Sequence, residues 1–396
     1  MKRVVAVLLA VAVFLTLGGC FVKPTQYETE EGQFANSAST GVWISYMEIR
    51  KMLTSENGFK AEVSKLVENC LALKIENVYV HVRSHCDSLY PSEYFPLVES
   101  AKGIGFDTFG YIADELHKNS INVHAWINPY RVSSSTDINA LPQDSIARQW
   151  LFDDDTENDK NIAFHNGIYL NPAEEDVRRL ILNGIREIMD NYQVESIHFD
   201  DYFYPTGNTE FDNKSYEEYK NTTKKPLPLD DWRRANVSTL ISSCYALVKY
   251  KDSDTLFGVS PSASIEKNKN EIYADVGKWI EDGILDYVVP QLYFGFEYPM
   301  EEYRFENLLS EWKSLASKNE NVKLIIGLPT YKIGSVLEPD KAEWQTKTDI
   351  IAKQAELCFK DSAVSGYVFF SYSSLFSQED LNTKQRNAYL EYMKNK

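Results

Sequence analysis

The stretch Ser196-Ile197-His198-Phe199-Asp200-Asp201-Tyr202-Phe203-Tyr204-Pro205 decides how this chain is interpreted. An apolar run over residues 194–199 leads directly into two adjacent carboxylates and then into an aromatic loop that ends at proline. Strands of parallel sheets are apolar along their length because both of their faces are covered. Acids at the carboxyl end of such a strand take the position in which α/β barrels keep their catalytic groups.

Aromatic rings beside these acids suit a sugar-binding cleft, because rings stack on the apolar faces of pyranoses. The pattern therefore indicates a glycoside hydrolase with Asp200 and Asp201 as its catalytic residues. The alternative reading is an acidic strand-to-helix turn whose carboxylates cap the following helix.

Strand-like and helix-like segments alternate from residue 41 to the end of the chain. The strand-like segments are residues 41–46, 77–83, 122–128, 194–200, 256–261, 285–293, 322–329 and 366–372. The amphipathic segments are residues 60–73, 108–119, 175–192, 232–249, 274–282, 303–318 and 349–360. This alternation predicts a parallel sheet with right-handed crossovers, and its eight units close a (β/α)8 TIM barrel of the α/β class. A doubly wound open sheet is the main rival, but no glycine-rich phosphate loop follows the first strand.

Two long insertions interrupt this rhythm, over residues 131–167 after the third strand and 205–230 after the fourth. Both follow the carboxyl end of a strand, so we expect both to lie on the catalytic rim of the barrel.

Strand parity selects the side chains that face inward, because neighbouring residues point to opposite faces. In the second strand the valines suit the helix-covered outside, which turns Tyr79, His81 and Arg83 inward. Barrel interiors are normally aliphatic, so the many polar and aromatic residues at the strand ends indicate a binding site rather than packing. The predicted substrate-binding residues are Trp43, His81, Arg83, His124, Trp126, Asn128, Tyr130, His198, Tyr202, Tyr204, Gln291 and Tyr293.

The chain resembles a family in segments that follow one another in order. They are Gly41-Val42-Trp43-Ile44, Ala125-Trp126-Ile127-Asn128-Pro129-Tyr130-Arg131, Tyr169-Leu170-Asn171-Pro172, residues 197–205, Pro290-Gln291-Leu292-Tyr293 and Ile326-Gly327-Leu328-Pro329. It is similar in these to the bacterial glycosyl-hydrolase-like proteins once known only as domain of unknown function 187. The resemblance implies a (β/α)8 barrel, often lipid-anchored, with glycosidase activity on peptidoglycan glycan strands freed of their stem peptides. The chain departs from the family after Pro261 and at Phe294, where the family has tryptophan.

The chemistry requires either two acids or one acid with help from the substrate. If the sugars carry 2-acetamido groups, one aspartate can polarise the acetamide while the other protonates the leaving oxygen. Asp200 is the preferred candidate for the nucleophile or charge-stabilising group, and Asp201 for the group that swings over the substrate. A two-carboxylate retaining mechanism would take its second acid from another loop, and Glu266 and Glu297 are the visible candidates.

Two other functions stay open. A noncatalytic carbohydrate-binding lipoprotein would need the aromatic residues but not the acids. A retaining glycosidase for α-glucans or galactosides would use the same fold with a different subsite. A metal-dependent barrel enzyme would need a cluster of histidines and carboxylates, which the spacing of these residues does not show, so no metal and no cofactor are expected.

The first twenty residues have the features of a bacterial lipoprotein signal. Lys2 and Arg3 precede an apolar run, residues 4–15, that is too short to span a bilayer comfortably. Leu17-Gly18-Gly19-Cys20 resembles a lipobox, so Cys20 is the predicted lipidation site. Residues 21–39 are polar and read as a flexible tether, and residues 40–396 as the barrel. These features predict a catalytic domain outside the cytoplasm, anchored to the membrane by lipid.

The net charge of −17 argues against nucleic acid as a ligand, because phosphates require clustered Lys and Arg. It also argues against electrostatic docking on anionic lipid. The four remaining cysteines show no CxxC or metal-type spacing, so isolated buried thiols are favoured over a disulfide. The expected partner is a polysaccharide, and the expected state is a monomer.

Overall fold

Eight parallel strands close into a barrel in a computed structural model that describes residues 39–337 and 339–394. They are β1 (Ser39–Ile44), β2 (Asn77–Arg83), β3 (Asn122–Ile127), β7 (Ser196–Phe199), β8 (Leu256–Val259), β9 (Tyr287–Val288), β10 (Lys323–Leu328) and β11 (Gly366–Phe369). Consecutive barrel strands pair in sequence order, and β11 pairs with β1 to close the ring. The predicted TIM barrel is confirmed, and each predicted strand overlaps one observed barrel strand.

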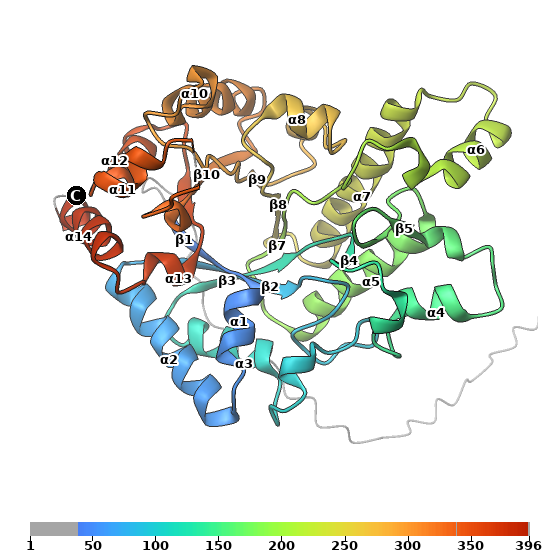
Figure 1. The fold of residues 1–396 in the computed structure, drawn as a ribbon, viewed down its shortest axis with the longest axis horizontal. Coiled ribbons are helices and arrows are strands. Elements are labelled where there is room, and N and C mark those ends of the chain that lie inside the picture. Colours follow the sequence, from blue (N-terminus) through green and yellow to red (C-terminus); the bar gives the residue numbers. More distant parts are fainter. Residues whose placement is uncertain (1–38, 338, 395–396) are drawn as a thin grey trace, which may run out of the picture. The chain divides into compact units, whose positions relative to one another are not determined.

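Helices surround the barrel (Figure 1). The long ones are α2 (Glu56–Ala72), α3 (Thr108–His117), α5 (Glu175–Asn191), α7 (Leu229–Lys251), α10 (Phe305–Ala316), α12 (Ile350–Lys360) and α14 (Asp380–Lys394). Helix α5 shows why these segments are helical, because Val177, Ile181, Ile185 and Ile188 recur at helical spacing and are buried. Shorter helices are α1 (Tyr46–Met52), α8 (Ile265–Asn270), α9 (Val276–Asp282), α11 (Lys341–Thr346) and α13 (Tyr372–Leu375).

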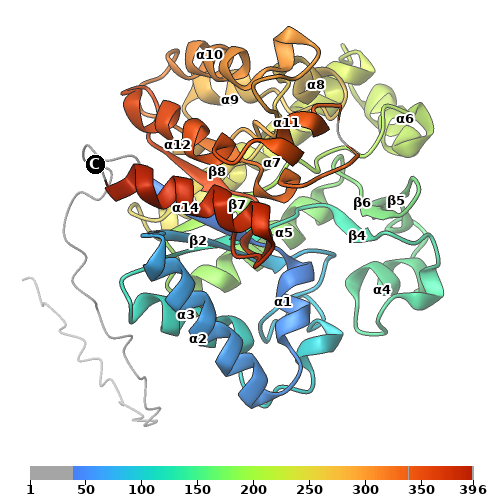
Figure 2. The same ribbon diagram turned by 60° about the vertical axis from the view of Figure 1, so that its left-hand side comes forward.

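The two insertions carry structure of their own. Residues 131–170 form a three-stranded antiparallel sheet from β4 (Arg131–Ser133), β5 (Ile162–Phe164) and β6 (Ile168–Leu170), with α4 (Ile146–Phe152). The second insertion contains α6 (Asn213–Thr222). Both Figure 1 and Figure 2 show this sheet, α4 and α6 gathered on one side of the barrel.

Two apolar clusters stabilise the barrel. The larger lies between the strands and the surrounding helices and contains Val80 and Ile127. The smaller fills the barrel interior with Trp43, Tyr79, Trp126, Tyr287, Val289, Ile325 and Val368. Gly258 is required beside Tyr287, because a Cβ there would lie 2.4 Å from the tyrosine ring.

Cys70, Cys86, Cys244 and Cys358 are buried and free, as the sequence favoured. Cys20, the signal segment and the tether lie outside the described residues, apart from Ser39, which begins β1. Over the described part of the chain, no helix is both long enough and apolar enough to cross a bilayer.

Candidate active site

A pocket of about 320 Å³ opens at the carboxyl ends of the barrel strands, and we call it the mouth pocket. Eight of the predicted site residues line it, namely Trp43, His81, Trp126, Asp200, Asp201, Tyr202, Gln291 and Tyr293. The other lining residues are Ser45, Tyr46, Met47, Arg131, Ser260, Tyr331 and Phe370. Asp200 and Asp201 are the two carboxylates among the lining residues.

Asp200 is held from several sides at the end of β7, and only 3% of its surface is exposed. Trp126 Nε1 donates to its Oδ2 at 3.1 Å, and Asn128 Nδ2 donates to the same oxygen at 3.3 Å. Burial, and then the negative charge of Asp201, raise the pKa of Asp200 to about 7, although Arg131 and the Trp126 hydrogen bond oppose the shift. Asp200 can therefore carry a proton near neutral pH.

Asp201 begins the following loop and is half-buried. Burial raises the pKa of its carboxyl, while a hydrogen bond from Gln291 and the charge of Arg131 oppose the rise. Gln291 is itself fixed, because its Nε2 donates to the Ser260 carbonyl at 2.9 Å. The two acids thus differ in exposure and partners although they are consecutive in sequence.

His81 lies in the same pocket with its hydrogen-bonding capacity unused. Its ring stacks on Trp126 with centroids 3.7 Å apart, and 3% of the residue is exposed. Within the described residues neither ring nitrogen has a hydrogen-bond partner. Burial, followed by the charge of Arg131, lowers the pKa of His81 well below its usual value. The neutral imidazole therefore offers one donor and one acceptor to a ligand.

Arg131 is a site residue that parity reasoning missed, because it follows β3 on an insertion. Its Nε donates to the Ser84 carbonyl at 3.0 Å, and its guanidinium lies 5.1 Å from the Tyr202 ring centre and 5.5 Å from that of Tyr46. It is the one Lys or Arg among the residues that line the mouth pocket. The presence of Arg131 in a quoted family segment was the only sequence signal.

Aromatic rings form the pocket walls. Tyr293 stacks on Phe370 with centroids 5.6 Å apart, and Phe370 meets Trp126 edge-on at 6.4 Å. Tyr202 is 54% exposed at the opening. The stacking surface predicted beside the acids is therefore present, and it also contains Tyr331, which follows β10, and Phe370, which follows β11.

His124 and His198 face inward as parity predicted, but they lie within the barrel and do not line the pocket. His124 Nδ1 meets Ser196 Oγ at 2.6 Å and its Nε2 meets Asn77 Oδ1 at 2.9 Å. His198 accepts from Trp43 Nε1 at 3.3 Å and contacts the Tyr287 hydroxyl at 3.1 Å. Asn128 likewise does not line the pocket and instead supports Asp200.

The predicted inward placement of Arg83 is wrong. The pairing of β2 with β3 shifts register between His81 and Arg83, which reverses the parity at that point. The guanidinium lies 3.6 Å from the ring centre of Phe95, and a Cβ at Gly184 of α5 would lie 2.3 Å from its Nη1. Arg83 therefore packs outside the barrel against α5.

Tyr130 and Tyr204 are also absent from the mouth pocket. Both are buried in the outer apolar cluster. Tyr204 packs edge-on against Phe211 and Tyr273, with the Arg233 guanidinium 5.3 Å from its ring centre. These two loop tyrosines turn back into the protein, a direction that strand parity cannot predict.

Neither candidate for a remote second acid reaches the pocket. Glu266 is exposed on α8, and Glu297 is exposed and pairs with Lys347 at 3.3 Å. Neither lines the mouth pocket, which leaves the consecutive aspartates as its acidic groups.

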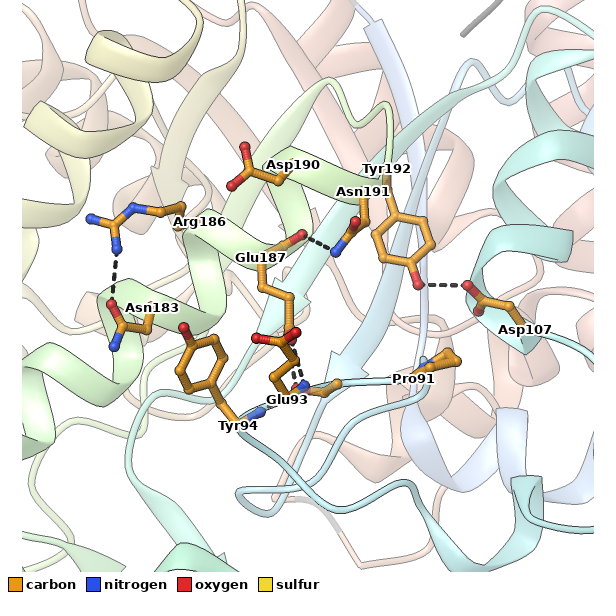
Figure 3. Close-up of a pocket in the computed structure, with 11 residues that line it drawn as sticks. Pro91, Glu93, Tyr94, Asp107, Asn183, Arg186, Glu187, Asp190, Asn191 and Tyr192 are labelled. Atoms are coloured by element: carbon orange, nitrogen blue, oxygen red, sulfur yellow. Dashed lines mark hydrogen bonds between the residues drawn. The ribbon is translucent and has the colours of Figure 1, made fainter. Parts of the chain in front are cut away.

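A larger cavity of about 610 Å³ lies beside α5 and the segment that follows β2 (Figure 3). Its side chains are mostly satisfied by one another, as when Tyr192 Oη donates to Asp107 Oδ2 at 2.5 Å and Ser92 Oγ donates to Glu187 Oε2 at 2.5 Å. It contains no predicted site residue and no strand end. We therefore place the candidate active site in the smaller mouth pocket. Across residues 39–337 and 339–394, no three His, Cys, Asp or Glu side chains are grouped as a metal ion would need.

A closed parallel barrel with paired acids and aromatic walls at its carboxyl-end mouth is an architecture of glycoside hydrolases. Comparison with known proteins agrees, since the model of the family described as glycosyl hydrolase-like 10 matches residues 39–346. The chain belongs to this glycosyl hydrolase-like family.

Two curated relatives are similar along most of the chain. Glycosyl hydrolase YngK of Bacillus subtilis is 31% identical over 343 residues, which cover 80% of this chain and 64% of the relative. Glycosyl hydrolase DigH of Escherichia coli K12 is 28% identical over 375 residues, which cover 85% of this chain and 79% of the relative. The chain thus spans somewhat less than two thirds of YngK.

Solved structures share the fold. The PgaB (BpsB) glycoside hydrolase domain from Bordetella bronchiseptica superposes with a TM-score of 0.61 at 13% identity, covering 89% of this chain and 98% of that one. A GH18 chitinase from Cycas revoluta, solved with (GlcNAc)4, has a TM-score of 0.51 at 9% identity, covering 90% of this chain and all of that one. At these identities the likeness concerns the barrel alone.

Proposed function

We propose that this protein hydrolyses glycosidic bonds in the amino-sugar glycan of bacterial cell walls, with peptide-free peptidoglycan strands as substrate. The observation that carries the proposal is the consecutive pair Asp200 and Asp201, the acidic groups of an aromatic-walled pocket at the barrel mouth. The family membership supports hydrolysis of a glycan in general. The amino-sugar substrate is the more specific part of the proposal.

The absence of a separate acid among the residues lining the pocket favours help from the substrate. A retaining mechanism with two carboxylates needs them on opposite sides of the bond, about 5 Å apart. With a 2-acetamido sugar, the acetamide oxygen attacks the anomeric carbon as the bond to the leaving oxygen breaks. A cyclic oxazolinium forms, and water then opens it at the anomeric carbon.

The two aspartates take different roles in this scheme. Asp200, whose pKa is raised to about 7, protonates the leaving oxygen and later receives a proton from the attacking water. Asp201, in its carboxylate form, accepts the acetamide N–H and balances the positive charge of the intermediate. This reverses the roles preferred from the sequence, where Asp200 was the charge-stabilising group.

The remaining pocket residues position the sugar. The neutral His81 ring can donate to one hydroxyl and accept from another. Trp43, Trp126 and Tyr293 offer ring faces to the apolar side of a pyranose. The rigidly held Arg131 supplies a positive charge for an anionic substituent.

The test is mass spectrometry of products from peptide-free peptidoglycan strands and from a panel of α- and β-glucans. Cleavage confined to strands of amino sugars, with inhibition by a thiazoline analogue, is the expected result. Cleavage of plain glucans without such inhibition would favour a retaining glucosidase or galactosidase instead. Binding of strands without any product would favour a noncatalytic carbohydrate-binding protein.

We also propose that the protein acts outside the cytoplasm as a monomer anchored through acylated Cys20. The motif Leu17-Gly18-Gly19-Cys20 supports this, and the residues concerned lie outside the described part of the chain. Cys20→Ala should release the protein from membranes or block its maturation. An unchanged membrane fraction, with no lipid mass on the N-terminal peptide, would contradict the anchor.

A further inference from the structure

A second pocket lies where the two insertions meet, and we call it the rim pocket. Its volume is about 580 Å³. One wall is the segment from Thr156 through β5 to His165, and the other runs from Thr206 to Ser215. Both walls follow the carboxyl ends of neighbouring barrel strands, β3 and β7, so the rim pocket shares the catalytic rim with the mouth pocket.

Hydrogen bonds lock the two insertions together. Asn171 Nδ2 donates to the Lys160 carbonyl at 2.9 Å and to Ser215 Oγ at 3.0 Å. Lys160 Nζ pairs with Glu218 at 2.5 Å. The walls are therefore fixed relative to each other before any ligand binds, which lowers the entropy lost on binding.

A buried ion pair holds the second wall from behind. Arg233 of α7 and Asp212 are fully buried and joined by two hydrogen bonds of 2.9 and 2.5 Å. Arg233 also donates to the Gly207 carbonyl at 3.2 Å and to that of Asn208 at 2.8 Å. Since Asp212 and Lys160 already have charged partners, neither requires an ionic ligand.

The rim pocket combines an aromatic side chain with polar side chains and with three exposed charged residues, Asp159, Glu210 and Lys214. Phe164 lines the rim pocket and is 47% exposed, so its ring is accessible to a ligand. The side chains of His165, Asn213 and Thr156 have no hydrogen-bond partner within the described residues. A ring face beside amide, imidazole and hydroxyl groups matches a pyranose, which has an apolar face and a polar edge.

The small antiparallel sheet of the first insertion connects the two pockets. Arg131, which lines the mouth pocket, pairs with Tyr169, and Tyr169 pairs with Ala163 of the rim pocket. Adjacent strands lie about 4.8 Å apart, so the backbones of Arg131 and Ala163 are about 10 Å apart across this small sheet. A few linked sugar rings span that distance.

We infer that the rim pocket is an accessory subsite that binds a sugar residue of the same polymer, a few residues away from the bond that the mouth pocket cleaves. The inference rests on the proposed glycan substrate and extends it, because it makes long strands better ligands than short ones. Phe164 provides the stacking face, and Asn213 reaches the polar edge of the sugar.

The test compares affinities for long and short peptide-free glycan strands by calorimetry, in full-length protein carrying Asp201→Asn to slow cleavage. Phe164→Ala should weaken binding of long strands by about tenfold and leave the affinity for disaccharides unchanged. Phe152→Ala is the matched control, since Phe152 is 51% exposed on the same insertion but does not line the rim pocket. Asn213→Ala serves as a second variant at an exposed position, should Phe164→Ala prove unstable.

The outcomes separate this inference from the proposed function. In one outcome the protein cleaves amino-sugar strands, but Phe164→Ala and Phe152→Ala bind long strands with equal affinity. This result would overturn the rim subsite and leave the proposed hydrolase activity intact. Tight binding of long strands that depends on Phe164, without any cleavage by the unmutated protein, would keep the subsite and overturn the hydrolase. Loss of affinity for disaccharides in Phe164→Ala would also overturn the inference, because the residue would then act on the mouth pocket.

Discussion

His81 and His198 lie on the inner side of the same barrel, but they differ in their hydrogen bonding. His198 lies within the barrel, where Trp43 donates to its Nε2 and the Tyr287 hydroxyl contacts its Nδ1. His81 lies one level higher, lines the mouth pocket and has no partner in the described chain for either ring nitrogen. Burial lowers the pKa of both rings, so both are neutral.

The difference shows that depth along the barrel axis, and not inward orientation alone, separates packing from function. Polar groups below the mouth are satisfied by neighbouring side chains, as buried groups must be. Polar groups at the mouth keep donors and acceptors available. A buried polar group without a hydrogen-bond partner lowers the stability of the fold. The presence of such groups at the mouth is explained by a ligand that forms the missing hydrogen bonds.

The strongest test of this division is the removal of charge at the mouth. Asp200→Asn and Asp201→Asn should each lower turnover by at least about a hundredfold, because either the proton donor or the charge-stabilising group is lost. Steady-state kinetics on peptide-free glycan strands measures the effect, with circular dichroism to confirm folding. Full activity of both variants would contradict the assignment of the mouth carboxylates to catalysis.

Paired histidine substitutions sharpen the comparison. His124→Ala should destabilise the protein by on the order of 2–4 kcal/mol, because it leaves a cavity and deprives Ser196 and Asn77 of partners. His81→Ala should cost under about 1 kcal/mol but weaken oligosaccharide binding about tenfold. Urea denaturation and binding titrations on both variants measure these two effects. Equal losses of stability would contradict the distinction between a structural His124 and a ligand-binding His81.

The pH dependence of catalysis probes the proton on Asp200. As the general acid, Asp200 is active when protonated, so kcat/KM should fall as pH rises through about 7. Rates of the unmutated enzyme across pH 4 to 9 record this limb. Rates that instead rise through the same interval would return Asp200 to the charge-stabilising role.

A smaller effect is expected on stability. Burial raises the pKa of Asp200 in the folded protein above its value in the unfolded chain. The folded state therefore loses stability as pH rises and the buried carboxyl ionises. This loss of stability begins above the pKa that Asp200 has in the unfolded chain and is complete once the pH exceeds its folded-state pKa of about 7. Asp200→Asn should therefore be neutral near pH 4 and more stable by about 1 kcal/mol at pH 8, less than the full shift because the amide faces hydrogen-bond donors. Thermal melts at both pH values measure it, and a large destabilisation would identify Asp200 as structural.

The fold was predictable because each barrel strand carries an apolar run and each crossover an amphipathic helix. The catalytic pair was predictable because Asp200 and Asp201 directly follow such a run. Parity also placed Trp43, His81 and Trp126 inward, and these line the mouth pocket. Local sequence suffices for such features, since the strand itself determines them.

The failures occurred where a residue's direction depends on tertiary structure. A register shift in β2 sent Arg83 outward, and parity has no means of locating a bulge. Tyr130 and Tyr204 follow strands into loops, where the alternation no longer applies.

The four buried cysteines have a practical consequence for studying this protein. Burial raises the pKa of Cys70 and of Cys86 to about 12, and raises the pKa of Cys244 and Cys358 as well. The thiolate is the form that reacts with alkylating reagents, so these four thiols should stay unlabelled for as long as the barrel is closed. Alkylation therefore reports barrel opening, and a cysteine introduced at an exposed position such as Asn213 could carry a fluorophore without removal of these native thiols.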